Sequence, residues 1–333
     1  MATLQGEPLV AVIMPTYNRR DLVGESIETV LAQTLADFEL LVIDDGSTDD
    51  TVKVVLEYAA RDARIRVFQR TTQPKGPASC RNIGIAQAKA GYCMFLDSDD
   101  LLAPQCLAGR IAATQKKPAV DMHVFQMQFF TNHPGDNSDL FFYAGTDALS
   151  SSLINGSPWG ISCPLWRTDT LRALGGFDES LLTSEDWDLH IRAFAFGYTH
   201  RIHDAVDCYC RQGRVSLTSQ DQSLTNVRQL TASYLKIARV FREQGLQPIY
   251  LNQLAGKCLT QCGRLHDLGD AAAAQQAWTM FAQAGILSGW KSVVGSAYLM
   301  LRRTVARDGT SLRARMLRKS MGLVAPRFLI WSY

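Results

Sequence analysis

The sequence predicts an α/β protein in which helices flank a mostly parallel central sheet, with a helical extension at the C-terminal end. Over the first hundred residues, short apolar runs alternate with segments whose apolar residues recur every three or four positions, as in amphipathic helices. After about residue 219 the periodic segments have helical spacing throughout. The chain has 333 residues, 47% of them hydrophobic, enough for one large domain or two modest ones.

Four strands and three helices are predicted before residue 100. Residues 9–14 form an unbroken apolar run, typical of a strand buried on both faces, and the mainly apolar segments 39–43, 65–68 and 92–96 are expected to form the other three strands. Of the helices between them, the first follows Asn18, the second opens at Asp49 and the third spans residues 81–90. Strands that alternate with helices in this way pair in parallel through right-handed crossovers.

Beyond residue 100 the predicted elements are more varied. Residues 120–130 mix Val, Met and Gln in a way that indicates a strand with an exposed face. Polar residues with Pro and Gly predict a loop at 131–143, and residues 175–197 hold a turn followed by a helix. Further on, a helix is expected over residues 271–284.

Polar clusters follow three of the four predicted parallel strands. They are Pro15-Thr16-Tyr17-Asn18 after the first strand, Asp44-Asp45-Gly46-Ser47 after the second and Asp97-Ser98-Asp99-Asp100 after the fourth. Because the carboxyl ends of parallel strands meet at one edge of a sheet, and ligands bind beyond that edge, the clusters are expected to form one site.

The acidic turn after the fourth strand suits a hard divalent cation. Asp97 and Asp99 are two residues apart, and Mg²⁺ or Mn²⁺ takes carboxylate and phosphate oxygens as ligands. Taken alone, the turn is equally well explained as a solvated turn or helix cap. No glycine fingerprint follows the first strand and no Gly-Lys-Ser/Thr loop occurs, so dinucleotide and P-loop chemistry are poorly supported.

In their order and spacing, these clusters resemble the inverting, nucleotide-sugar-dependent glycosyltransferases of family 2. The resemblance continues through Gly76, Ala78, Arg81-Asn82, Gly91-Tyr92, Gly175-Gly176-Phe177-Asp178 and Glu185-Asp186-Trp187-Asp188-Leu189, and it covers residues 9–218. Members of this family have the Rossmann-like GT-A fold. The resemblance therefore implies a catalytic domain at residues 1–219, with its nucleotide-sugar half at about 1–100 and its acceptor half at about 101–219. Residues 220–333 are expected to form a helical region with a basic tail.

The resemblance implies a role for each matching residue on the donor side. The residues expected to bind the nucleotide-sugar are Pro15, Tyr17, Asp45, Arg81, Asp97 and Ser98. Pro15 and Tyr17 match positions that frame the nucleobase, and Asp45 matches the acceptor of a uracil-like N–H. Arg81 matches a basic residue near the diphosphate.

The resemblance also implies the metal, catalytic and acceptor positions. Asp99, with Asp97, matches the ligands of a divalent cation, Mn²⁺ or Mg²⁺. Asp186 matches the proposed general base, with Glu185 as its catalytic neighbour, and Trp187 is placed at an acceptor-sugar subsite. An alternative for the Glu185-Asp186 pair is an acidic first turn that favours the helix dipole.

The implied reaction is the metal-dependent, inverting transfer of a sugar from a nucleoside-diphosphate sugar, UDP-linked by preference, to a hydroxyl of a glycan or lipid-linked acceptor. A hydroxyl that displaces a diphosphate needs a carboxylate to take its proton on the face opposite the leaving group. One departure leaves a second interpretation open. Family members often carry a histidine where this sequence has Gly213, so a catalytically impaired sugar-nucleotide-binding or scaffolding relative is the alternative. Structural roles are expected for His200 and His203.

Charge is unevenly distributed. The chain carries a net charge of +2, but residues 302–333 hold eight Lys or Arg and one acid, a charge of +7, which leaves −5 for the rest. Bulky apolar residues interleave with these cations, which suits an anionic membrane surface as well as it suits a helix that packs on the protein. No nucleic-acid-binding module accompanies the charge, so nucleic acid is not expected as a partner.

Neither a secretory signal nor a membrane-spanning run is recognised in the sequence. The eight cysteines lack Cys-x-x-Cys pairs and are expected to be reduced thiols packed as small hydrophobic residues. These features predict a cytoplasmic protein, with the basic tail as a means of peripheral attachment to the cytoplasmic face of the membrane.

Overall fold

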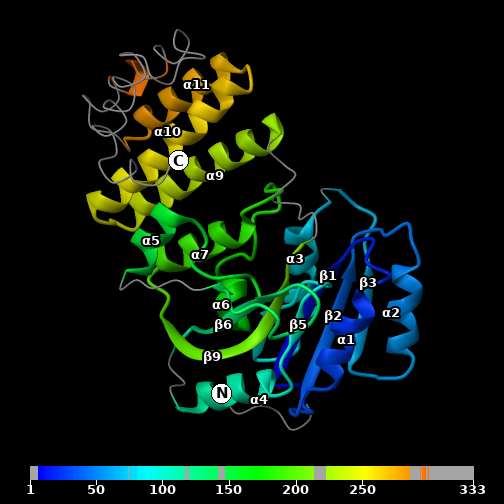
Figure 1. The fold of residues 1–333 in the computed structure, drawn as a ribbon. Helices are drawn as coiled ribbons and strands as arrows, with labels where there is room; N and C mark the ends of the chain where they lie inside the picture. Colours follow the sequence, from blue (N-terminus) through cyan, green and yellow to red (C-terminus); the bar gives the residue numbers. More distant parts are fainter. Residues whose placement is uncertain are drawn as a thin grey trace. The chain divides into compact units, whose positions relative to one another are not determined.

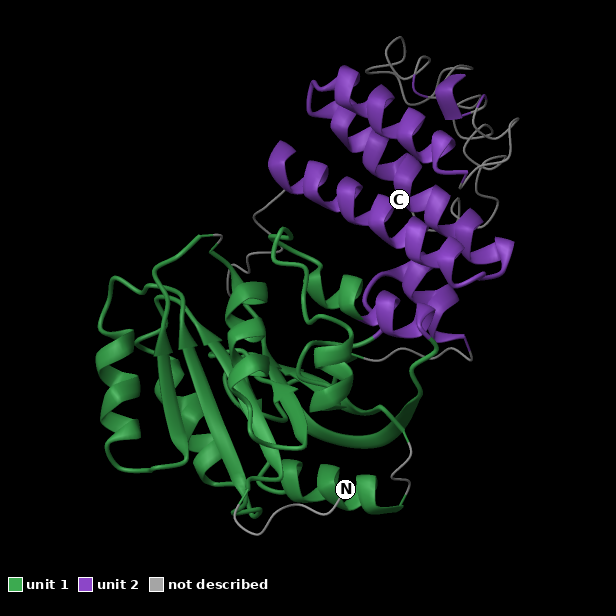
Figure 2. Ribbon diagram, turned by 180° about the vertical axis from the view of Figure 1, so that it is seen from behind, with its two compact units in different colours: residues 1–144, 159–189, 197–215 green, residues 145–158, 190–196, 216–333 purple. Residues whose placement is uncertain are grey.

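A computed structural model describes residues 7–73, 75–116, 120–141, 147–213 and 223–285, together with 293, 295–297 and 299. The chain divides into two compact units, coloured separately in Figure 2. Unit 1 comprises residues 1–144, 159–189 and 197–215, and unit 2 comprises residues 145–158, 190–196 and 216–333. The predicted domain boundary at residue 219 and the basic tail at 302–333 lie outside the described residues, so both stay predictions.

The N-terminal part of unit 1 contains the predicted parallel strands. They are β1 (Val10–Thr16), β2 (Phe38–Asp44), β3 (Ile65–Gln69) and β4 (Tyr92–Phe95), in the sheet order β3-β2-β1-β4 (Figure 1). The pairings β1–β2, β1–β4 and β2–β3 are all parallel. Every residue of β2 is buried, including Glu39 and Asp44, as expected for a strand inside a parallel sheet.

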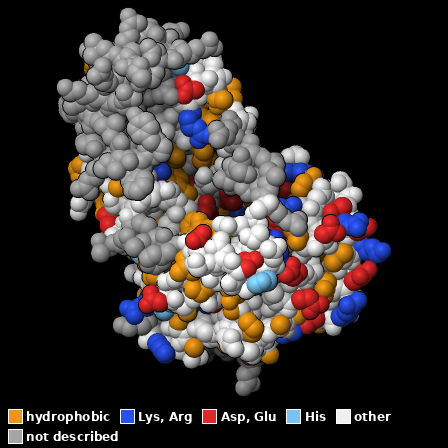
Figure 3. Space-filling model, in the orientation of Figure 1, with side chains coloured by type: hydrophobic (Ala, Val, Ile, Leu, Met, Phe, Trp, Pro, Cys, Tyr) orange, Lys and Arg blue, Asp and Glu red, His pale blue; other side chains and the backbone are white. Residues whose placement is uncertain are grey.

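Helices α1 (Val23–Leu31), α2 (Thr51–Ala59) and α3 (Pro77–Gln87) connect these strands. The outward face of α2 carries exposed Lys53 and Glu57, exposed Arg61 follows the helix, and charges of both signs are interspersed there (Figure 3). Helix α3 starts four residues earlier than predicted, because Pro77 occupies its first position, where the fixed φ of proline suits a helix start.

Helix α3 packs closely on β1. A Cβ atom added to Gly84 of α3 would lie 2.3 Å from Cγ2 of Ile13 in β1, so only glycine allows this approach. The contact matters for the site, because α3 also carries Arg81 and Asn82.

The remaining strands of unit 1 form the other half of the sheet. They are β5 (Leu101–Leu102), β6 (Met122–Phe130), β7 (Leu140–Phe141), β8 (Pro164–Arg167) and β9 (His200–Arg211), and they extend the order beyond β4 as β8-β6-β9-β5, with β7 on β6. Within the described residues this gives one nine-stranded sheet. Because β8 pairs antiparallel with β4 and β6, the sheet is parallel in its first half and mixed in its second.

Two local predictions for this half are wrong. Residues 120–130 were expected to expose one face, but Met122, His123, Val124 and Phe125 are all buried. Strand β6 is paired on both sides, by β8 and β9, and the glutamines that suggested exposure lie in its second half. The loop expected at 131–143 contains the short strand β7, which pairs with β6.

Several buried polar side chains in unit 1 pair with one another. Arg110 of α4 (Cys106–Lys116) is 0% exposed and donates from Nε and Nη2 to both carboxylate oxygens of Asp207, at 2.7 and 2.6 Å. His123 and His203 lie across β6 and β9 with Nδ1 and Nε2 3.0 Å apart. All eight cysteines are free thiols and seven are buried, as predicted.

Two further helices of unit 1 lead toward the site. Helix α6 (Thr168–Ala173) follows β8, and helix α7 (Glu185–Ala195) carries the predicted Glu185-Asp186-Trp187 motif at its start. Residues 185–189 of α7 belong to unit 1 and residues 190–195 to unit 2.

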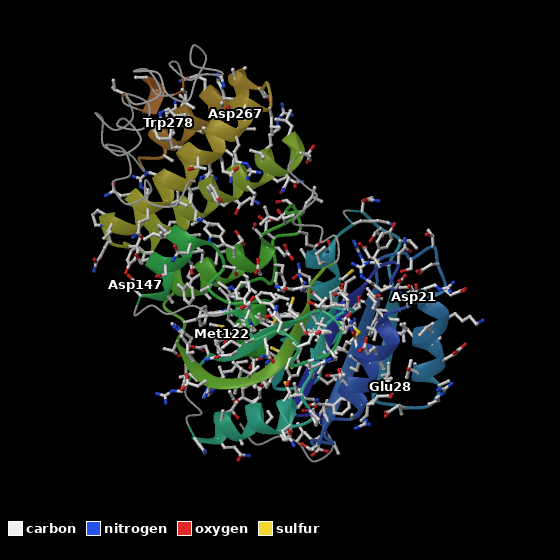
Figure 4. All side chains as sticks on the ribbon, viewed as in Figure 1. Asp21, Glu28, Met122, Asp147, Asp267 and Trp278 are labelled. Carbon is white, nitrogen blue, oxygen red and sulfur yellow. The ribbon has the colours of Figure 1, made fainter. Side chains whose placement is uncertain are left out.

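Unit 2 is helical in its described part. Its helices are α5 (Ala148–Asn155), α9 (Leu224–Glu243), α10 (Pro248–Asp267) and α11 (Ala271–Gln283), and α10 contacts α5, α9 and α11. Asp147 caps the start of α5 by accepting a hydrogen bond from Ser150 N, and Trp278 of α11 is fully buried (Figure 4). Among the described residues, no helix is long and apolar enough to cross a bilayer.

Candidate active site

The polar clusters after β1 and β2 are joined by hydrogen bonds. The backbone N–H of Asp45 donates to Thr16 O, and that of Asn18 donates to Ser47 Oγ, each at 2.9 Å. The side chain of Asn18 in turn accepts from Thr48 N at 2.9 Å. The structure thus brings the first two strand-end clusters together, as the parallel arrangement predicted.

The predicted nucleobase residues lie at this junction. Pro15 pairs with Ile43 in the β1–β2 register, and Tyr17 is 47% exposed, with Lys75 Nζ 5.2 Å from its ring centre. Tyr17 therefore offers an aromatic face on which a planar base can stack.

Asp45 is engaged on both carboxylate oxygens. Oδ1 forms an ion pair with the guanidinium of Arg70, and Oδ2 accepts from Gly76 N at 2.8 Å. The side chain is 11% exposed, so a base that hydrogen bonds to it must share these oxygens or displace one of their donors.

The acidic turn after β4 reaches the same edge of the sheet. Arg19, just beyond the first cluster, has its Nε 3.4 Å from Oδ2 of Asp99. The side chains of Asp97 and Asp99 are 39% and 24% exposed, whereas Ser98 is buried. Burial raises the pKa of Asp99, and the negative charge of Asp97 raises it further.

Asp100 and Arg211 hold the acidic turn through hydrogen bonds. Burial first, and then the charges of Asp97 and Asp99, raise the pKa of Asp100, whose Oδ1 accepts from Arg211 N at 3.0 Å. The Arg211 side chain donates from Nε to Asp99 O at 3.0 Å and pairs with Glu25 at 2.5 Å.

The chemistry of this turn fits a divalent cation. Two neighbouring carboxylates, Asp97 and Asp99, repel each other, and a hard cation would relieve that repulsion with ligands of the type it prefers. Among the described residues, no group of three or more His, Cys, Asp or Glu side chains is arranged to hold a metal ion. Phosphate and water oxygens would therefore have to supply the remaining ligands.

Helix α3 links this turn to the downstream motifs. Asn82 donates from Nδ2 to Phe177 O at 2.9 Å and accepts from Phe177 N at 2.8 Å, while Ser79 and Asn82 both hydrogen bond to Glu179. A Cβ atom on Gly176 would lie 2.3 Å from Asn82 Oδ1, which explains why glycine is needed there.

Arg81 is buried between two carboxylates. It was expected near the diphosphate, but its side chain is 3% exposed and both terminal nitrogens are used by carboxylates. Nη1 donates to Glu185 Oε1 at 2.6 Å and Nη2 to Asp97 Oδ1 at 2.7 Å. Although burial alone would lower it, the charges of Asp97 and Glu185 raise the pKa of Arg81.

The Glu185-Asp186-Trp187 motif forms the first turn of α7. Glu185 is buried against Arg81, and burial raises its pKa while the arginine opposes the shift. Asp186 Oδ1 accepts from Trp187 N at 2.7 Å. The indole of Trp187 is only 4% exposed, so in this structure it packs in the interior and offers no open platform for an acceptor sugar.

Sequence reasoning missed three arginines that meet the predicted carboxylates: Arg19 at Asp99, Arg70 at Asp45 and Arg211 behind the acidic turn. The position of Arg19, one residue after the first cluster, was the one local signal available. Gly213 has φ +84°, a backbone conformation that glycine adopts more readily than other residues, and the residues that directly follow it lie outside the described part of the chain.

The chain is similar to known sugar-transferring proteins. Residues 11–157 match the family model Glycosyl transferase family 2, a segment that holds the three strand-end clusters and Arg81 but ends before Glu185. Chondroitin synthase of Escherichia coli is 29% identical over 220 residues, which cover 63% of this chain and 30% of that protein. The chain spans from 13% to 45% of the lengths of eight curated relatives.

Two solved structures share the fold. S. aureus TarS, residues 1–349 in complex with UDP-GlcNAc, has a TM-score of 0.69 and is 19% identical, with 95% of this chain and 91% of that chain covered. The mannosyltransferase PcManGT from Pyrobaculum calidifontis, in complex with GDP-Man and Mn²⁺, has a TM-score of 0.53, also at 19% identity, with 98% and 88% covered. These likenesses confirm the predicted GT-A fold with its helical C-terminal part. In residues 11–157, which hold the strand-end clusters, the chain is thus similar to glycosyl transferase family 2.

Proposed function

We propose that this chain is an inverting glycosyltransferase that moves a sugar from a nucleoside-diphosphate sugar to a hydroxyl of a glycan or lipid-linked acceptor. The observation that carries the proposal is the arrangement around Arg81. One buried guanidinium binds Asp97, in the turn suited to the donor, and Glu185, beside the candidate base Asp186. Donor-side and acceptor-side carboxylates are thereby held within one site of unit 1.

In the proposed reaction the acceptor oxygen attacks the anomeric carbon and the bond from that carbon to the diphosphate oxygen breaks. The electron pair leaves with the diphosphate, and the hydroxyl proton passes to the Asp186 carboxylate. The N–H of Trp187, bonded to Asp186 Oδ1 at 2.7 Å, orients the base. Because the chemistry is a single displacement, the configuration at the anomeric carbon inverts.

A UDP-sugar is the proposed donor. Tyr17 offers a stacking face, and Asp45 matches the family position that accepts a uracil-like N–H. The UDP-GlcNAc in the TarS structure supports this choice, although PcManGT holds GDP-Man in the same fold.

Asp99 and Asp97 would hold Mn²⁺ or Mg²⁺, which would neutralise negative charge on the departing diphosphate. The repulsion between the two carboxylates supports this assignment, as does the Mn²⁺ in PcManGT. Arg19, 3.4 Å from Asp99, adds a fixed positive charge on the same side.

The proposed acceptor is a glycan or a lipid-linked molecule, and the proposed second partner is an anionic membrane surface. The name of the chondroitin synthase relative supports a glycan acceptor. The cationic, apolar tail at 302–333 supports attachment to an anionic membrane surface. The role of Trp187 in acceptor binding would require a movement that exposes its ring.

A thermal-shift screen of nucleotide-sugars with and without Mn²⁺ tests the donor, because a ligand that binds only the native state raises the melting temperature. The selected donor is then incubated with the protein and release of nucleoside diphosphate is measured. Gly213 supports the alternative, a sugar-nucleotide-binding relative without catalysis. Donor binding without any diphosphate release, with or without candidate acceptors, would favour that alternative and refute the enzyme.

A further inference from the structure

Arg81 bridges two carboxylates, those of Asp97 and Glu185, whereas a diphosphate-binding arginine would direct its donors toward the ligand. Its guanidinium is buried beneath the site and stacks 5.6 Å from the ring centre of Phe177, which itself packs edge-on against Phe95. Its Nε is buried and makes no hydrogen bond, so the side chain is held by its two carboxylate partners and by packing. A phosphate group would have to displace one of those carboxylates to reach it.

The two partners of Arg81 belong to different functional elements. Asp97 belongs to the acidic turn after β4, and Glu185 is the first residue of α7. Lysine could not replace arginine here without loss, because the donors of an ammonium all lie on one nitrogen, whereas the planar guanidinium holds Nη1 and Nη2 apart so that each meets its own carboxylate. The bridge therefore joins the donor turn to the segment that carries Asp186.

The segment ahead of Asp186 needs such a restraint. Ser184 has φ +63°, a left-handed conformation that is strained for a residue other than glycine. Its carbonyl accepts from Asp188 N at 3.1 Å, which starts the hydrogen-bonding of α7. Glu185 directly follows Ser184, and its ion pair with Arg81 holds this turn in place although the backbone at Ser184 is strained.

We propose that Arg81 is a positioning residue: by bridging Asp97 and Glu185, it holds the start of α7 so that Asp186 faces the acceptor hydroxyl once the donor is bound at the acidic turn. This inference rests on the proposed function. It assigns Arg81 to the placement of the base, not to the diphosphate, and it assigns Glu185 to the same task, not to proton transfer.

The first arm of the test measures hydrogen exchange in the full-length protein without ligand, so it does not depend on activity. In Arg81→Lys and in Glu185→Gln, amides of residues 185–189 should exchange at least about 10-fold faster than in the wild type, because the restraint on this turn is lost. Glu185→Gln keeps the shape of the side chain, so it serves if Arg81→Lys folds poorly. Unchanged exchange at residues 185–189 in both variants would overturn the proposal.

Arg110→Lys is the matched control. Arg110 is also a buried arginine paired with a carboxylate in unit 1, but its partner Asp207 has no part in the strand-end site. This variant should lose stability while exchange at residues 185–189 and turnover per folded molecule stay at the wild-type values. If it accelerated exchange at residues 185–189 as much as Arg81→Lys does, the effect would reflect general destabilisation and the proposal would fail.

The second arm separates positioning from donor binding. Arg81→Lys should lower kcat for transfer at least about 10-fold, while the donor KM and the affinity for UDP with Mn²⁺ change less than about 3-fold. If donor affinity fell as much as kcat, Arg81 would be assigned to diphosphate binding. An unchanged kcat would refute the positioning role. If the wild type transferred no sugar, the proposed function would fail by itself, and the exchange arm would still decide whether Arg81 holds the start of α7.

Discussion

Replacing Gly84 with alanine tests whether close packing of α3 on β1 sets the position of the site. An alanine Cβ would lie 2.3 Å from Ile13 Cγ2, whereas carbon atoms in contact are about 3.5–4.0 Å apart. The helix or the strand must therefore move by about 1.2–1.7 Å. Overpacking of this kind costs about 1–3 kcal/mol, offset by the gain of about 1 kcal/mol when glycine in a helix becomes alanine.

Gly109→Ala isolates the steric part of that change. Gly109 lies inside helix α4, and nothing lies within 4 Å of a Cβ added there. The helix-propensity gain is then common to both variants, so Gly84→Ala should be less stable than Gly109→Ala by about 1–3 kcal/mol.

Denaturation by urea, followed by circular dichroism, measures the difference, and differential scanning fluorimetry should show it as roughly 2–12 °C in Tm. Gly84→Ala should also lower turnover, because a shift of α3 carries Arg81 and Asn82 away from their partners. Equal stability of the two variants would refute the packing argument.

The remaining predictions concern the reaction and the tail. Asp99→Ala should abolish most turnover, and calorimetry should show that Mn²⁺ no longer tightens the binding of nucleoside diphosphate. Full activity of the wild type in saturating chelator would contradict the metal assignment. Asp186→Asn should lower transfer by at least about 10²-fold in a steady-state assay and leave donor affinity nearly unchanged, because an amide cannot take the proton. Loss of donor binding with transfer retained would show that the roles are reversed. Deletion of residues 302–333 should release the protein from anionic vesicles in a sedimentation assay, and vesicle binding by the full chain should weaken as salt is raised. A truncated protein that binds vesicles as well as the full chain does would rule out the tail as an anchor.

The sequence by itself determined the parallel half of the sheet and the place of its polar clusters. Residues 10–14 of β1 are buried on both faces, so their apolar run is unbroken and visible in one short window. Once strands and helices alternate, the right-handed crossover puts all carboxyl ends on one edge, and Asp45 and the acidic turn with Asp99 follow the ends of β2 and β4. The motif order then sufficed to indicate the family.

Only the tertiary structure decided what these side chains touch. Glu185 lies 104 residues after Arg81 and Asp97 lies 16 after it, and no local pattern predicts that one guanidinium will bind both. The burial of Trp187 and of β6 likewise depends on segments distant in the chain. The periodicity of a sequence indicates which face of a helix or strand is apolar. Its ion pairs and its exposure depend on the side chains that pack against it, and for Arg81 those are two carboxylates.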